Sequence, residues 1–217
     1  MRTLNRLIVC SLLAASLLPL AGFGETVATD VSIEEKFDGP LSAEWFWGLG
    51  TWTAKDGVLR GFESGTRRHG PVKMRRFPLR DGTVECEFRL TGKATFVGII
   101  FNGTPERGHI VHLVMAKDKI RVLAHSAKGE GGELLSQPKS IAVGKWHNVK
   151  IEFKGSEMIA TVDGQTFTAR ADCIGEEKLT FGLGGDSGGP EGEQAGTLEF
   201  RALRATSFLS RPKTTMP

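Results

Sequence analysis

The chain has 217 residues and a formal net charge of +3. This length fits one domain and is enough to bury a full core without disulfide or metal staples. Because the charge is close to balance, nothing in the composition indicates nucleic acid as a partner.

The first 24 residues have the features of a secretory signal peptide. Arg2 and Arg6 precede an apolar run at residues 7–20, and the small residues Gly22 and Gly24 end the segment. The run is too short for a stable membrane span, although an uncleaved N-terminal anchor is the alternative. Cleavage would remove two arginines and no acidic residue, leaving 26 basic and 25 acidic residues and a net charge of +1. We therefore expect a periplasmic or secreted protein with no membrane span after cleavage.

Short alternating runs separated by Gly, Asp, Asn and Pro fill the rest of the sequence, and no long helical period is present. Alternation of apolar and polar residues is typical of half-buried strands. It predicts fifteen strands, at residues 32–37, 45–49, 51–54, 58–62, 71–77, 82–90, 96–101, 109–116, 119–125, 133–137, 145–154, 158–162, 165–169, 179–184 and 197–206. So many short strands indicate an all-β fold, a jelly-roll sandwich of two antiparallel sheets over residues 31–209, with a disordered tail at 210–217.

The segment 144–165 carries the clearest pattern. Val149, Ile151 and Phe153 alternate with charged residues, which predicts a strand with one face in the core. The dipeptide Asp163-Gly164 then predicts a tight hairpin turn.

Glu85 and Glu87 are expected on one face of a strand, with backbones about 7 Å apart. Paired carboxylates at separations of this order act as acid and base on glycosidic bonds. The alternative is a solvated strand face, which Thr83 and Arg89 would share.

His109, His112 and His125 come from the two strands of one predicted hairpin. Strict alternation puts His112 on the face of Ile110 and Val114, from which it could reach a ligand groove as a hydrogen-bonding or acid–base group. The same alternation puts His109 on the opposite face and His125 at an exposed strand end. The alternative for His112 is a core or rim histidine whose hydrogen bonds are satisfied.

The other candidate ligand-binding residues are aromatic, basic or amide. Trp45 and Trp47 would share one side of a strand and suit a platform for a sugar ring, with core packing as the alternative. Arg67 and His69 follow a turn and could hold a carboxylate, a sulfate or a polar sugar, or lie on a solvated loop. Asn102 begins an Asn-Gly-Thr sequence that fits a glycosylation sequon or a plain turn.

Cys86 and Cys173 are the cysteines that would remain after cleavage. They could form one disulfide in an oxidising compartment, and a lone buried thiol at Cys86 is the alternative. No Cys/His spacing suggests a zinc site. We therefore expect no metal, and no cofactor is indicated.

Segments spread along the chain are similar to one family. They are Phe37-Asp38-Gly39 with Trp45, residues 50–59, the strand at 97–101, the hairpin at 144–164 and the closing strand at 198–203. Together they resemble the concanavalin A-like sandwich domains of the 3-keto-disaccharide hydrolase type, which are common in secreted bacterial proteins. The resemblance implies the sandwich fold and a carbohydrate-related, hydrolase-like role.

Two departures from the family pattern bear on that role. Phe96-Val97 stands where members often have Asn-Ser, and Gly108-His109-Ile110 stands where they often have Gly-aromatic-Glu. The resemblance therefore carries no catalytic assignment.

Three functions remain open on the sequence. The first is a glycoside hydrolase acting through Glu85, Glu87 and His112. The second is a noncatalytic carbohydrate-binding module, and the third is an interaction module of the cell envelope. The first two imply a carbohydrate ligand.

Overall fold

The computed structural model describes residues 30–65, 69–127 and 131–208, and the expected signal peptide and tail lie outside these ranges. All fifteen predicted strands are present, with ends that differ by a few residues. They are β1 (Val31–Glu35), β2 (Trp47–Leu49), β3 (Thr51–Lys55), β4 (Val58–Phe62), β5 (Val72–Leu79), β6 (Asp81–Leu90), β7 (Phe96–Asn102), β8 (His109–Ala116), β9 (Lys119–His125), β10 (Gly131–Pro138), β11 (His147–Lys154), β12 (Glu157–Val162), β13 (Gln165–Arg170), β14 (Lys178–Asp186) and β15 (Leu198–Phe208). Two short 3₁₀ helices, η1 (Asp172–Gly175) and η2 (Gly192–Gln194), connect the last strands.

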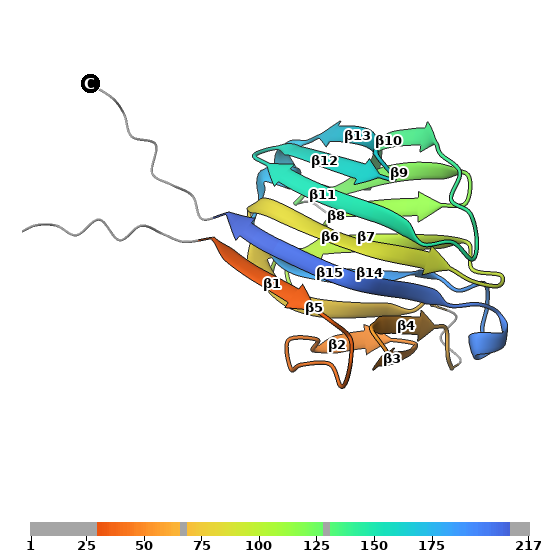
Figure 1. Ribbon diagram of the computed structural model, residues 1–217. Coiled ribbons are helices and arrows are strands. Elements are labelled where there is room, and N and C mark those ends of the chain that lie inside the picture. The colour runs from red at the N-terminus through yellow and green to blue at the C-terminus, as the bar shows by residue number, and fades with distance from the viewer. Residues whose placement is uncertain (1–29, 66–68, 128–130, 209–217) are drawn as a thin grey trace, which may run out of the picture.

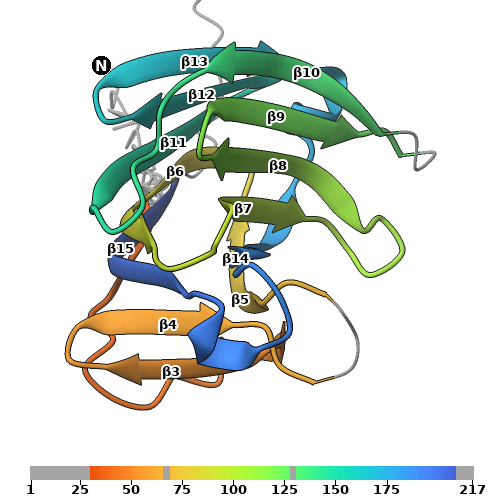
Figure 2. The same cartoon turned by 90° about the vertical axis from the view of Figure 1, so that its right-hand side faces the viewer.

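The strands form two antiparallel sheets that pack face to face, which confirms the predicted sandwich (Figure 1). Sheet A has the order β13-β12-β11-β6-β15-β4-β3, and β1 pairs with β15. Sheet B has the order β10-β9-β8-β7-β14-β5-β2. Figure 2 shows the two layers from the side, with β11, β6 and β15 in one and β8, β7 and β14 in the other.

Alternating residues from both sheets fill the space between them. The fully buried aromatic side chains include Phe88, Phe101, Phe153, Phe167, Phe181 and Phe200, and Trp45 is 4% exposed. Phe101 of sheet B meets Phe153 of sheet A edge to face, with ring centroids 4.7 Å apart, which is a favourable aromatic geometry. The Asp163-Gly164 turn is present, and both residues have positive φ, as a two-residue turn of type I′ requires.

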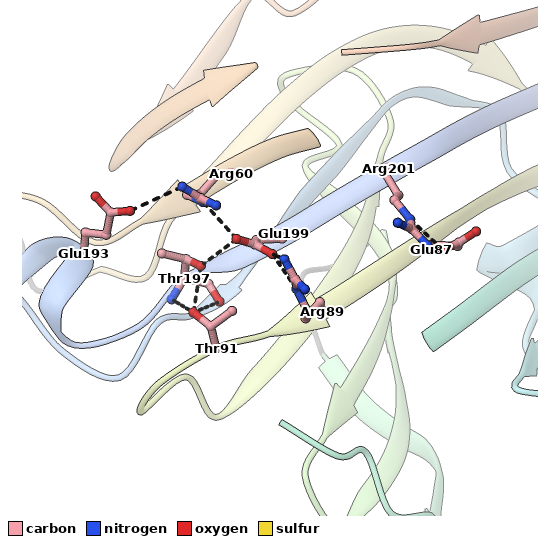
Figure 3. A network of polar contacts seen from close by, with 8 residues as sticks. All are labelled: Arg60, Glu87, Arg89, Thr91, Glu193, Thr197, Glu199 and Arg201. Atoms are coloured by element: carbon pink, nitrogen blue, oxygen red, sulfur yellow. Dashed lines mark hydrogen bonds and ion pairs between the residues drawn. The ribbon is translucent and has the colours of Figure 1, made fainter. Parts of the chain in front are cut away.

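The outer face of sheet A carries a network of charged side chains (Figure 3). Glu199 binds Arg60 and Arg89 at 2.8 Å and 2.5 Å. A separate pair joins Glu87 to Arg201 at 2.5 Å. This face is therefore covered by ion pairs that fix cross-strand neighbours.

Both cysteines are free, so the disulfide considered from the sequence is not formed. Cys86 points into the core from the middle of β6, whereas Cys173 lies in η1 at the end of the sandwich. Burial raises the pKa of the Cys86 thiol to about 12, so it stays protonated and inert. Within the described residues, no helix is long and apolar enough to cross a membrane.

Lys178 is a fully buried cation at the start of β14. Its Nζ donates to the carbonyl oxygens of Arg80, Ile174 and Glu176 at 3.0, 2.6 and 2.9 Å. It also lies 4.3 Å from the centroid of the Phe153 ring. Burial lowers the pKa of Lys178 to about 8.

Replacing Lys178 with methionine is expected to lower the free energy of unfolding by about 1–3 kcal/mol, because three buried carbonyl groups lose their donor. The unfolded chain keeps a lysine pKa near 10.4, so between about pH 8 and pH 10 it binds more protons than the folded chain. Lys178 therefore makes wild-type stability rise with pH in that window. Urea unfolding at a series of pH values would measure the loss of stability and its pH dependence. An equal rise in the stability of the methionine variant between about pH 8 and pH 10 would show that Lys178 does not cause the pH dependence.

Candidate functional site

A groove runs along the outer face of sheet B, where β14 has few side chains of its own. Phe181 and Leu183 point into the core, so Thr180, Gly182 and Gly184 face outward. Two of these three positions have no side chain. β14 lies between β5 and β7 in the sheet, and the side chains of Met74 and Val72 on β5 lie over the two glycines, where a Cβ would meet them at 2.3 and 3.1 Å.

A close backbone approach forms one wall of the groove. A Cβ on Gly70 would lie 1.9 Å from the carbonyl oxygen of Gly185. Only glycine at residue 70 therefore allows the chain before β5 to lie so close to β14.

The part of the groove nearest β8 is the polar chamber, with a volume of about 320 Å³. The name refers to Asn102 and the three histidines, His69, His109 and His112; the rest of the lining is mostly apolar, and includes Trp47, Phe96, Val72, Met74 and Ile100. The edge strand β2 brings Trp47 beside Met74, and the indole remains 47% exposed. An exposed indole at the rim of a polar groove can stack on a sugar face.

His109 and His112 lie on the same face of sheet B, so the expectation that His109 points to the opposite face is wrong. The register of β7 and β8 shifts between Phe101 and Asn102, which leaves Ile110 as an extra, bulged residue in β8. Ile110 is fully buried, and His109 is turned outward. The ring centroids of His109 and His112 are 4.6 Å apart.

His125 on β9 completes a cluster of three imidazoles, with its ring centroid 5.0 Å from that of His112. Burial first, and then the neighbouring imidazoles, lower the pKa of His112 to about 3. Burial and His125 also lower the pKa of His109. His109 and His112 are therefore neutral at pH 7. No group of metal ligands is found in the ranges that the structure describes.

Asn102 fixes the tautomer of His109. Its side-chain oxygen lies 2.8 Å from Nδ1 of His109, and the two residues face each other across β7 and β8. An amide oxygen can only accept, so Nδ1 carries the proton and Nε2 keeps its lone pair. By contrast, Nε2 of His112 is buried and has no hydrogen-bond partner in the described part of the chain.

Replacing Asn102 with aspartate is expected to raise the pKa of His109 above its wild-type value. A carboxylate at Nδ1 stabilises the imidazolium, and it would oppose the effects of burial and of His125. NMR titration of the histidine ring protons would measure the change. Asn148, which is exposed on sheet A, is the matched control: its aspartate variant adds the same charge and should leave His109 unchanged.

Arg107 binds the backbone of two residues of the histidine cluster, and the sequence analysis did not identify it as a site residue. Its guanidinium donates to the backbone oxygens of His109 and His125 at 2.7 Å and 2.6 Å. It also binds Glu176 through two hydrogen bonds, at 2.5 Å and 3.1 Å. A single arginine in a loop has no sequence signature, so only the fold reveals this role.

The other predicted site residues are distributed over the molecule. Trp45 is 4% exposed and packs edge to face on Phe181, so it is a core residue and not half of a platform with Trp47. Arg67 lies outside the described residues. His69 lines the polar chamber, and its Nδ1 donates to the Gly70 carbonyl oxygen at 2.7 Å.

Glu85 and Glu87 lie on the outer face of sheet A, so the sandwich separates them from His112 on sheet B. Each carboxylate faces an arginine, Arg204 at 3.9 Å and Arg201 at 2.5 Å. Glu85, Glu87 and His112, which the sequence suggested as one catalytic group, therefore do not share a groove. Strand alternation alone could not show that their strands belong to different sheets.

Two stacked antiparallel sheets with an open groove on one outer face define a concanavalin A-like sandwich. The fold is similar to Bacillus licheniformis β-glucanase (12% identity, 82% of this chain and 98% of that one, TM-score 0.60). It is also similar to the Crh5 transglycosylase without ligand (11% identity, 82% of this chain and 85% of that one, TM-score 0.60). A third similar structure is the carbohydrate-binding module CBM66 from Bacillus subtilis (13% identity, 71% of this chain and 91% of that one, TM-score 0.55). Identities this low show the fold alone.

The model of the family described as 3-keto-alpha-glucoside-1,2-lyase-like domain matches residues 33–205, and the chain belongs to this family. The predicted family is thereby confirmed. None of the curated proteins matches the chain.

Proposed function

We propose that the groove on sheet B binds a 3-keto glycoside and that the chain cleaves it by elimination. The observation that carries this proposal is a pair of neutral imidazoles, His109 and His112, in a chamber without a carboxylate among its described lining residues. Hydrolysis by two carboxylates needs a pair of acids that this groove lacks. Elimination beside a ketone needs only a base and a group that stabilises the enolate.

The residues take the following parts. Nε2 of His109, which Asn102 leaves free to accept, removes the proton from C2 of the sugar. The electron pair of the C2–H bond forms the C1=C2 double bond, and the bond from C1 to the glycosidic oxygen breaks. The departing oxygen leaves as the anion and takes one proton from water, and His109 returns the C2 proton to the solvent. His112, whose Nε2 is buried, carries its proton on Nδ1 and donates from there to the C3 oxygen on which negative charge develops, and Trp47 stacks on the ring.

The test is incubation of the protein with 3-keto-α-glucosides in D₂O. Elimination predicts release of the aglycone with either a conjugated enone, seen by ultraviolet absorbance, or a released sugar carrying solvent deuterium at C2. A reaction without protein corrects for spontaneous exchange. Release of unlabelled 3-keto sugar without an enone would contradict the elimination.

A noncatalytic carbohydrate-binding role is the second candidate. Its support is the exposed indole of Trp47 at the rim of a groove that has no acid pair. It predicts saturable binding of glycosides, with loss on replacement of Trp47 by alanine, and no turnover of any keto sugar.

We also infer that the protein is exported. The support is the charged and apolar pattern of residues 1–24. Sequencing the N-terminus of the protein recovered from its producing cell would show a start near residue 25, and an intact N-terminus would contradict cleavage.

A further inference from the structure

A second chamber adjoins the polar chamber, and we call it the apolar chamber. Its volume is about 740 Å³, within the range of small-molecule sites. Its lining includes Phe46, Trp47, Arg76, Asn102, Pro105 and Leu179. Trp47 and Asn102 line both chambers, so a ligand in one can continue into the other.

The rings at the edge of sheet B define the character of this chamber. Phe46 and Trp47 are adjacent in sequence, and both are exposed, at 44% and 47%. Pro78 on β5, Pro105 in the loop after β7 and Leu179 on β14 add further apolar surface. Exposed aromatic rings gathered beside a binding groove indicate an apolar ligand group.

Few polar groups in the apolar chamber are free to bind a ligand. The Arg76 guanidinium lies 4.3 Å from the centroid of the Phe46 ring and donates to the Ala43 carbonyl oxygen. Asn102 uses its side-chain oxygen on His109. The polar groups that remain are mainly donors, from Arg76, Asn102 and two threonines, and no carboxylate among the described lining residues accepts from the hydroxyl groups of a second sugar ring. A ligand hydroxyl that is buried without a partner lowers the affinity.

The chamber also lacks a proton donor for a leaving group. No Asp, Glu, His, Cys or Lys is among its described lining residues, and arginine does not give up its proton. A sugar alkoxide leaves poorly without an acid. A phenol, with a pKa near that of tyrosine, about 10, leaves as the anion much more readily.

We propose that the apolar chamber holds an aromatic aglycone, so that the substrates of this chain are aryl glycosides rather than disaccharides. The inference rests on the proposed function, because it assigns the sugar ring to the polar chamber. The aryl ring stacks on Trp47 and Phe46, and the glycosidic oxygen lies near Asn102, where the chambers join.

The experiment compares the binding of three unreactive probes by calorimetry: methyl α-D-glucoside, 4-nitrophenyl α-D-glucoside and maltose. None has a keto group, so none can be eliminated. We expect the nitrophenyl glucoside to bind at least ten-fold more tightly than the methyl glucoside, and maltose to bind within three-fold of it. Replacing Phe46 with alanine, or Pro105 with serine, should reduce the aryl preference to less than three-fold without changing methyl glucoside binding.

Phe208 provides the matched control, because it is 40% exposed and lies at the end of β15 on sheet A. Its alanine variant should keep the full aryl preference. Tighter binding of maltose than of the nitrophenyl glucoside, or a preference that survives both chamber variants, would overturn the inference while leaving the proposed function intact. If no probe binds, the inference fails, and the turnover of 3-keto glucosides decides the proposed function by itself. If the aryl preference is present but no 3-keto glucoside is cleaved, only the lyase activity fails.

Discussion

Replacing His109 with glutamine is expected to reduce the turnover of a 3-keto glucoside by about 100- to 10,000-fold, the usual contribution of a general base. Glutamine keeps a polar group of similar length, but it cannot accept the C2 proton. Because the base acts in the transition state, the loss should fall on kcat, with little change in KM. Enone absorbance or aglycone release measures both constants.

The control for this experiment is Glu87→Gln. Glu87 is paired with Arg201 on the outer face of sheet A, away from the groove, so we expect full turnover. Full activity of the His109 variant would remove this residue from the mechanism. A loss of turnover in the Glu87 variant alone would indicate that the carboxylates Glu85 and Glu87 carry the reaction instead.

The sequence was sufficient for the strands because the pattern that defines them is local. Alternation in segments such as 147–154 identifies both the strand and its buried face. The same rule failed at Ile110, where one bulged residue reverses the side on which His109 lies. A bulge depends on the pairing of β8 with β7, and that pairing is not visible in the sequence of β8 alone.

The assembly of the site was beyond the sequence for a related reason. Glu87 and His112 look alike as polar residues on alternating strands, but β6 belongs to sheet A and β8 to sheet B. Only the strand order separates them. One feature of the groove wall had a sequence signal that can be recognised afterwards: in β14, Gly182 and Gly184 alternate with core residues, and this lets Val72 and Met74 of the neighbouring strand lie over β14 and line the polar chamber.

Glu199 is the central charge of the network on sheet A. It lies on β15 directly opposite Arg60 on β4 and Arg89 on β6, so both neighbouring strands present a cation to the same carboxylate. The Glu199 side chain is only 2% exposed, and Thr197 supplies a further hydrogen bond at 3.4 Å. The carboxylate therefore connects three strands of sheet A (Figure 3).

Replacing Glu199 with glutamine is expected to lower the free energy of unfolding by about 3 kcal/mol. This is the low end of the range for a broken buried ion pair, because the side chains of Arg60 and Arg89 are 43% and 30% exposed and can be hydrated. For a chain of this size the loss corresponds to a decrease of roughly 6–12 °C in Tm. The pair of Glu87 with Arg201 is more exposed, at 28% and 42%, so Glu87→Gln should cost less than about 1 kcal/mol. Thermal unfolding of both variants measures the difference, and equal losses would show that burial does not set the strength of these pairs.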